Sequence, residues 1–289
     1  MAVHVLIIDG NAAETRARQV AAGGSDSGDA YAATVARLGS ELGATIDCDI
    51  VRPADSQPVW AGGGRLADYS GAAITGSALN VYSDQPAVTR QVDLTKAVLA
   101  AAVPVFGSCW GLQVAVAATG GRVIENPLGR EFGFARRIAL NRAGRDHPMF
   151  RNKSQVFEAI TVHRDCVAEL PPGALELARN EMGLQAAEIR QGAGVVWGVQ
   201  YHPEYTLGEI AATARRYGDA LVQDELFRDT VDLLAFSSDV DALHANPGNR
   251  RLAWRLGLGP GVIQPSQRLA ELRNWIEFQV LKRRLAALT

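Results

Sequence analysis

Short apolar runs alternate with segments of helical periodicity in the first half of the chain. The apolar runs occupy residues 3–9, 45–52, 71–75 and 103–106, and apolar positions recur at helical spacing in residues 31–42, 88–102 and 112–118. Strands that alternate with helices form mostly parallel sheets that are covered on both faces. Because strand–helix–strand crossovers are right-handed, this pattern predicts a doubly wound α/β layout.

The pattern changes in the second half of the chain. Short β-like runs recur at residues 136–140, 155–161, 175–180, 184–189 and 195–201, and their hairpin-like spacing predicts that the sheet is mixed. From about residue 207 the periodicity is helical, with breaks at 247–248 and 257–265 and a final helix predicted at 267–288. We therefore expect a domain at residues 1–209 and a C-terminal helical extension at 210–289, packed on the core or at an oligomer or partner interface.

Composition narrows the class of protein. The chain has 289 residues, of which 47% are hydrophobic, and a formal net charge of -2, so it has no general attraction to nucleic acid or anionic membranes. Its three cysteines lack a Cys-X-X-Cys pair, which argues against a disulfide framework and a structural zinc site. The first residues predict a strand instead of a signal peptide, and no apolar run approaches the roughly 18 residues that a membrane span needs. We expect a cytoplasmic protein with reduced thiols.

One cysteine stands in a distinctive turn. Cys109 follows the apolar run 103–106 and lies between Gly107 and Gly111, at the start of a predicted helix. A strand–Gly-X-Cys-X-Gly–helix sequence predicts a nucleophile elbow, in which the middle side chain is exposed above the sheet. A thiol at a helix N-terminus also favours the thiolate. Cys48 and Cys166 lack this context, and we expect them to be small apolar residues of the interior.

A base and a group that orients it follow another predicted strand. The run 195–201 ends at His202, and Glu204 lies two residues later. Residues i and i+2 of an extended segment point the same way, so the Glu204 carboxylate can fix the tautomer of the His202 imidazole. The sequence thus predicts a triad of Cys109, His202 and Glu204 in which a thiolate rests beside an imidazolium. The backbone N–H groups of Trp110 and Gly76 are the predicted donors of an oxyanion hole.

These motifs resemble those of a known family. The segments Gly-Ser-Cys-Trp-Gly-Leu-Gln at 107–113, Tyr-His-Pro-Glu at 201–204 and Ile-Thr-Gly-Ser at 74–77 resemble the class I, triad-type glutamine amidotransferases over residues 3 to about 210. Arg-Glu-Phe-Gly at 130–133 and His-Arg-Asp at 163–165 resemble segments of the members of the GMP synthetase type. The resemblance implies a flavodoxin-like fold, no metal and no cofactor. It also implies that the substrate is held by Gln113, by the backbone of Glu131, Phe132 and Gly133, and by His163.

The chain departs from the family pattern in two places. The usual Gly-Gly-Pro of the oxyanion loop is Thr-Gly-Ser at 75–77, so an activating partner is one way to position that loop. The loop expected at residues 10–30 and the tail 210–289 exceed a minimal glutaminase, which leaves room for an unusual acceptor, a partner or a homo-oligomer contact.

Three functions remain open from the sequence. The first is hydrolysis of the γ-carboxamide of L-glutamine through a cysteinyl thioester, with the ammonia passed to a partner synthetase. The second is a stand-alone hydrolase of a substituted γ-glutamyl amide or peptide that uses the same triad, and the third is a non-catalytic regulatory module. The triglycine at 62–64 lacks the Lys-Ser/Thr of a phosphate-binding loop, so we expect no ATP site; we expect the arginines between 129 and 145 to be solvated.

Overall fold

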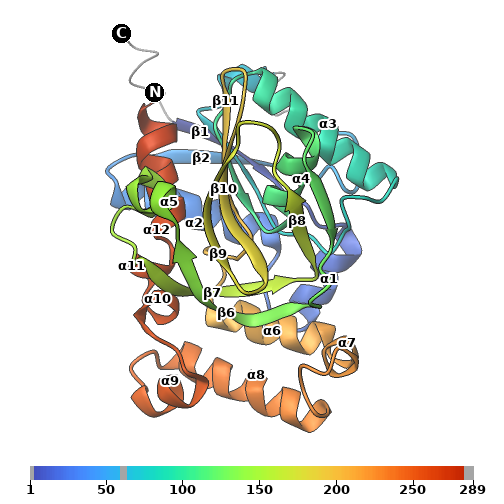
Figure 1. Ribbon diagram of the computed structural model, residues 1–289, viewed down its shortest axis with the longest axis vertical. Helices are drawn as coiled ribbons and strands as arrows, with labels where there is room; N and C mark the ends of the chain where they lie inside the picture. Colours follow the sequence, from blue (N-terminus) through green and yellow to red (C-terminus); the bar gives the residue numbers. More distant parts are fainter. Residues whose placement is uncertain (1–2, 59–63, 283–289) are drawn as a thin grey trace.

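A nine-stranded mixed sheet forms the centre of the molecule (Figure 1). The computed structural model describes residues 3–58 and 64–282. The strand order is β2-β1-β3-β4-β11-β10-β9-β6-β7, and a separate two-stranded sheet pairs β5 with β8. The strands are β1 (Val3–Ile8), β2 (Ile46–Val51), β3 (Gly71–Ile74), β4 (Val105–Ser108), β5 (Arg122–Glu125), β6 (Glu131–Leu140), β7 (Val156–His163), β8 (Asp165–Glu169), β9 (Leu175–Asn180), β10 (Gly183–Gln191) and β11 (Gly194–Val199).

The sheet has a parallel half and an antiparallel half. Strands β2, β1, β3, β4 and β11 pair in parallel, whereas β10, β9, β6 and β7 continue the sheet with antiparallel pairs. Consecutive residues Leu6, Ile7 and Ile8 of β1 are all fully buried, as expected for a parallel strand with helices on both faces. The predicted fold class, a flavodoxin-like, mostly parallel mixed sheet, is confirmed.

Helices cover both faces of the parallel half. Helices α3 (Pro86–Ala100) and α4 (Trp110–Ala118) pack on one face, and α2 (Ser27–Glu41) and α12 (Ala270–Trp275) pack on the other. The final helix continues as one π-helical segment, Ile276–Val280. Trp275 is fully buried, and its ring centroid lies 5.9 Å from that of Phe106 in β4. The end of the described chain is therefore part of the main core.

Most of the remaining C-terminal helices form a layer beside the antiparallel half, drawn in orange at the bottom of Figure 1, and the last two lead from it toward α12. The remaining helices are α6 (Leu207–Tyr217), α7 (Asp219–Gln223), α8 (Thr230–Ala245), α9 (Arg250–Leu256), α10 (Pro260–Ile263) and α11 (Pro265–Arg268). Helix α6 packs against α8, and Phe132 and Phe134 of β6 contact Phe236 of α8. The predicted boundary between residues 209 and 210 falls inside α6, so this helix belongs to both parts.

Some segments differ from the sequence expectation. Residues 10–30 are not a continuous loop, because Ala13–Ala21 form α1 and α2 begins at Ser27. Helix α1 is held by tertiary contacts, since Gln19 Nε2 donates to Glu209 Oε2 at 3.1 Å and to Thr213 Oγ1 at 3.1 Å. Parts of the loop expected at 53–65 and the end of the last predicted helix lie outside the described residues. No helix within the described ranges is long and apolar enough to cross a membrane.

Candidate active site

The turn between β4 and α4 has the geometry of a nucleophile elbow. Cys109 has φ 50° and ψ −99°, in the positive-φ region that a non-glycine residue rarely adopts. A Cβ on Gly107 would lie 2.5 Å from the backbone of Gly111, so only glycine allows the strand and the helix to approach this closely. The Cys109 N–H donates to Val199 O at 2.7 Å, which ties the elbow to the end of the neighbouring strand β11.

His202 follows β11 and lies beside the elbow. Its Nδ1 is 2.8 Å from Glu204 Oε1, its Nε2 is buried without a hydrogen-bond partner among the described residues, and Cys109 is near enough to raise the pKa of the imidazole. Burial lowers the pKa of His202, but the Glu204 carboxylate and Cys109 outweigh it and raise the pKa to about 10. This environment favours an imidazolium beside the sulfur. The structure therefore brings together the three residues of the predicted triad.

Glu204 is held by a second buried contact. Its Oε2 accepts from Ser108 Oγ at 2.9 Å, and the Tyr31 hydroxyl lies 3.1 Å from the same Ser108 Oγ. Ser108 immediately precedes the elbow, and Tyr31 is fully buried in α2. This chain of hydrogen bonds fixes the carboxylate that orients His202. Tyr31 belongs to no motif, and Ser108 lies in the Gly-Ser-Cys segment at 107–113 without a role assigned to it, so sequence reasoning missed this hydrogen-bond chain.

The loop after β3 packs directly on the imidazole. A Cβ on Gly76 would lie 2.4 Å from His202 Cε1, so no other residue fits there. The Gly76 carbonyl accepts from Asn11 Nδ2 at 3.0 Å and from Thr75 Oγ1 at 2.9 Å, and Ser77 Oγ donates to Gly10 O at 2.8 Å. The Thr-Gly-Ser loop is thus fixed by hydrogen bonds from within this chain.

A cavity of about 240 Å³, which we call the Cys109 cavity, opens on one side of the triad. Its lining includes Cys109, Gln113, Arg130, His163 and Asp165. Gln113 and His163 therefore lie where the sequence predicted. Both nitrogens of His163 are occupied, however: Nδ1 is 2.9 Å from Asp165 O and Nε2 is 2.8 Å from Glu131 Oε2. This histidine shapes the cavity wall and has no nitrogen left for a substrate.

The segment 131–133 does not line the Cys109 cavity. The Glu131 carboxylate is bonded to His163, Asn180 and Gln185, and the Phe132 ring packs against Phe227 and Phe236. Gly133 lies against Phe236 with φ 85°. The roles predicted for these three residues remain predictions, and the structure gives the side chains of Glu131 and Phe132 other contacts.

Arg130, the residue before this segment, lines the cavity instead. The expectation that the arginines of this region are solvated is wrong for Arg130, whose side chain is only 9% exposed. Its Nε is 2.7 Å from Asp224 Oδ2, and its guanidinium lies over the Tyr217 ring at 4.9 Å. Asp224 also contacts Arg164, at 3.2 Å. Asp224 comes from the C-terminal helices, so no local sequence signal could have revealed this arrangement.

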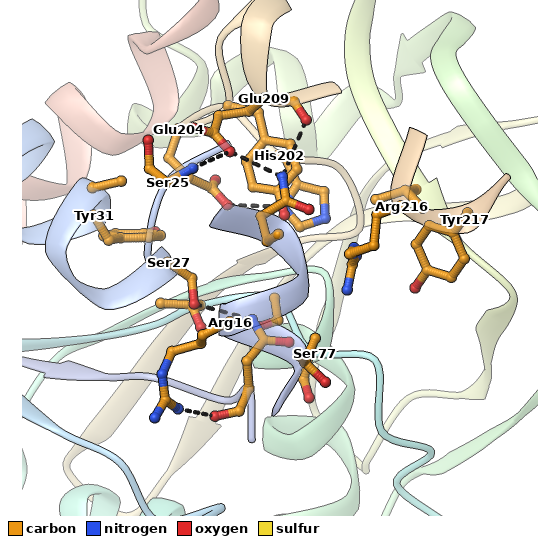
Figure 2. Close-up of a pocket in the computed structure, with 18 residues that line it drawn as sticks. Arg16, Ser25, Ser27, Tyr31, Ser77, His202, Glu204, Glu209, Arg216 and Tyr217 are labelled. Carbon is orange, nitrogen blue, oxygen red and sulfur yellow. Dashed lines mark hydrogen bonds and ion pairs between the residues drawn. The ribbon is translucent and has the colours of Figure 1, made fainter. Parts of the chain in front are cut away.

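A second, more enclosed cavity of about 50 Å³ is lined by His202 and Glu204 (Figure 2). We call it the His202 cavity. It shares Ser77, Val162 and Tyr217 with the Cys109 cavity. The other lining residues come from three parts of the chain: the segment from the loop after β1 to the first turns of α2, the loop after β3, and the segment from the triad to the end of α6. They are Asn11, Thr15, Arg16, Gln19, Ser25, Ser27, Ala30, Tyr31, Thr75, Gly76, His202, Glu204, Tyr205, Glu209 and Arg216.

Residues 25–215 match the family "Glutamine amidotransferase class-I". The chain therefore belongs to the class I glutamine amidotransferases, and it is an amidohydrolase by family. Among the described residues, no cluster of His, Cys, Asp and Glu is suited to hold a metal ion.

The relatives differ in how much of their own length is matched. A γ-glutamyl-L-1-hydroxyisopropylamide hydrolase of a Pseudomonas species is 35% identical over 77% of this chain and 74% of its own length. A GMP synthase of Thermosipho africanus is 38% identical over 36% of this chain, and the match spans only 19% of that enzyme. A solved glutamine amidotransferase structure from Thermotoga maritima superimposes with a TM-score of 0.60 at 20% identity, covering 97% of this chain and 99% of the other, and it shows the shared fold.

Proposed function

We propose that this chain is a self-contained hydrolase of γ-glutamyl amides that carry a small substituent on the amide nitrogen. The observation that carries the proposal is that the triad residues line two adjoining cavities, Cys109 the one and His202 and Glu204 the other. The Cys109 side offers polar groups for a glutamyl moiety. The His202 side is enclosed by α1 and α6 of this same chain, where a departing amine would lie.

The proposed reaction proceeds through a thioester. Cys109 Sγ attacks the γ-carbonyl carbon, and the tetrahedral oxyanion forms against the N–H groups of Trp110 and the Gly76 loop; a well-placed donor contributes about 2.7–4 kcal/mol to such a transition state. The C–N bond then breaks while His202 transfers its proton to the leaving nitrogen. Water that is deprotonated by His202 hydrolyses the thioester, which releases glutamate and regenerates the thiolate–imidazolium pair.

The Cys109 cavity is suited to the two charged groups of a glutamyl moiety. Arg130 and Arg164 line it and provide positive charge for an α-carboxylate. Asp165 and the side-chain amide of Gln113 provide acceptors for an α-ammonium group. The extent of the match to the Pseudomonas hydrolase also supports a self-contained enzyme, since it spans three quarters of that protein.

A second candidate is a glutaminase that supplies ammonia to a partner synthetase. The matches to GMP synthases favour it, because those relatives are named as glutamine-hydrolysing enzymes. Under this alternative, the His202 cavity would provide a path for ammonia and water.

Glutamate release by the purified chain tests the proposal. The substrates are L-glutamine, γ-glutamyl isopropylamide, γ-glutamyl-L-1-hydroxyisopropylamide and γ-glutamyl-L-alanine, with Cys109→Ala as the control. We expect at least one substituted amide to be cleaved with a higher kcat/KM than glutamine, and Cys109→Ala to lose this activity by at least about 10⁴-fold. Cleavage of glutamine alone would favour the second candidate. Full turnover by Cys109→Ala would exclude the cysteine mechanism.

A further inference from the structure

Charged groups around the His202 cavity differ in how they are paired. Arg16 is 2.6 Å from Asp55, 3.3 Å from Asp26 and 3.8 Å from Asp9. The Glu209 carboxylate accepts from Gln19 Nε2 at 3.1 Å. The side chains of Arg16 and Glu209 are therefore already bonded to other side chains of this chain.

Arg216 is the exception. Within the described chain it makes no ion pair and no hydrogen bond, and its buried Nε has no partner. Its guanidinium lies over the ring of Tyr217 at 4.6 Å, a contact that leaves the N–H groups unused. The Arg216 side chain as a whole is only partly buried, but its Nε donor is cut off from solvent, and leaving such a donor without an acceptor is costly. A ligand that brings an acceptor, best a negatively charged one, would satisfy it. The neighbouring Arg215, by contrast, is 2.6 Å from Asp241.

The position of Arg216 points to the leaving group. Tyr205 stacks on the His202 ring with centroids 4.1 Å apart, and Arg216 is close enough to oppose the rise in the pKa of Tyr205 that burial causes. Figure 2 shows Arg216 and Tyr217 on one side of the cavity, across from Tyr31 and Ser27. Since His202 gives its proton to the departing nitrogen, a substituent on that nitrogen would extend into the cavity that Arg216 lines.

The cavity also limits the size of the substituent. Its volume is about 50 Å³. A water-sized group needs about 10–15 Å³ measured in this way, so the space accommodates roughly three to five heavy atoms. The five heavy atoms of alanine other than its nitrogen meet this limit, whereas a long or aromatic amine does not.

We infer that the His202 cavity is a subsite for the leaving amine, and that Arg216 binds a carboxylate on this amine. The inference rests on the proposed function and specifies its substrate class as γ-glutamyl conjugates of small amino acids. A carboxylate matches the planar, bidentate donor geometry of a guanidinium, whereas a hydroxyl takes one hydrogen bond and a methyl takes none.

Three of the amides named above form a matched series for the test. The departing amines of γ-glutamyl-L-alanine, γ-glutamyl-L-1-hydroxyisopropylamide and γ-glutamyl isopropylamide differ only in whether the branch ends in a carboxylate, a hydroxymethyl or a methyl group. We expect kcat/KM of the wild-type chain to fall in that order. Arg216→Met should lower kcat/KM for γ-glutamyl-L-alanine roughly 10- to 100-fold and change that for the isopropylamide less than about threefold. Arg216→Lys should keep part of the preference.

Arg215→Met is the matched control, because Arg215 lies on the same helix and pairs with Asp241 instead of lining the cavity. It should leave the order of the three substrates unchanged. An equal loss on all three amides in Arg216→Met, or a wild-type preference for the isopropylamide, would overturn the assignment of Arg216. The proposed function would survive either result as long as Cys109-dependent hydrolysis of a substituted amide persists.

Discussion

The two cavities beside the triad are built in different ways. The Cys109 cavity is bounded by strand ends and by arginines that are already paired, such as Arg130 with Asp224. The His202 cavity is bounded largely by helices α1 and α6, and it contains Arg216, which has no anionic partner in the described chain. The arginine side chains of the Cys109 cavity therefore have anionic partners before substrate binds, whereas Arg216 in the His202 cavity has none among the described residues.

This difference separates two requirements of one reaction. A pocket whose charged groups are held by other charged groups is preorganised, and it suits the part that every substrate has in common. A pocket with an unsatisfied group gains most from the one ligand that supplies the missing partner, so it suits the part that distinguishes substrates. Substitutions in the two cavities should therefore have different signatures across the amide series.

The largest effect is expected in the triad itself, at Glu204, which lines the His202 cavity. Glu204→Gln removes the charge that stabilises the imidazolium, and kcat/KM should fall roughly 10²- to 10⁴-fold, equally for every amide. Because the pKa of His202 is raised to about 10, the protonated form persists below that pH, and wild-type activity should decline only near pH 10. In Glu204→Gln the alkaline limb of the pH–rate profile should move to lower pH.

Ser108→Ala provides the comparison for this variant. It keeps the Glu204 charge and removes one hydrogen bond to Glu204 Oε2, so the loss should be smaller and the alkaline limb should move less. An unchanged limb in Glu204→Gln would show that Glu204 does not control the protonation of His202.

An intermediate effect is expected in the Cys109 cavity, at Asp224. Asp224→Ala releases Arg130 and Arg164, which should raise KM roughly 5- to 20-fold for all amides alike, with little change in kcat. Asp239→Ala, which removes an exposed ion pair with Arg255 in the same helical layer, should leave KM unchanged. A KM increase confined to γ-glutamyl-L-alanine would contradict the division of labour between the cavities.

The smallest effect on catalysis is expected at Glu188, which lines neither cavity. Burial raises the pKa of Glu188, but hydrogen bonds from His147, Arg190 and Trp197 outweigh it and lower the pKa to about 2. The ionised form therefore stabilises the fold above about pH 4.5, and this contribution is lost as the pH falls toward 2.

Glu188→Gln should thus reduce the free energy of unfolding by about 1–3 kcal/mol at pH 7. Urea unfolding at pH 7, 5 and 3 should show the difference from wild type shrinking with acid, while kcat and KM at pH 7 stay close to wild type. A difference that does not depend on pH would mean that the carboxylate charge is not the stabilising feature.

Features that depend on residues close together in the sequence could be predicted from the sequence alone. The alternation of apolar runs and helices predicted the parallel half of the sheet, and the residues around Cys109 and His202 predicted their proximity, because strand ends in such a sheet meet at one edge. Helix α1 was missed because it is held in place by Gln19 contacts with α6, nearly 200 residues away in sequence. The short strands β5 and β8 were missed because they are stabilised by pairing with each other.

The chemistry of the cavities was harder to predict for the same reason. Arg130 lies in a segment that the family motif singled out, yet which residue of that segment faces the cavity depends on Asp224 in the C-terminal helices. Arg216 has no sequence signature at all, since what marks it is the absence of a partner among the residues that surround it in three dimensions.

The contact between the last helix and the active-site strand also bears on how the protein is made. Tyr201, the residue before His202, donates its buried hydroxyl to Glu271 Oε1 at 2.5 Å, and Lys153 is 3.0 Å from the same oxygen. On a ribosome, the helix that carries Glu271 emerges long after the triad residues have been added to the chain. The nascent polypeptide therefore carries every reacting group before it can bury Tyr201, and we expect the enzyme to gain activity only after the helix that carries Glu271 has been synthesised.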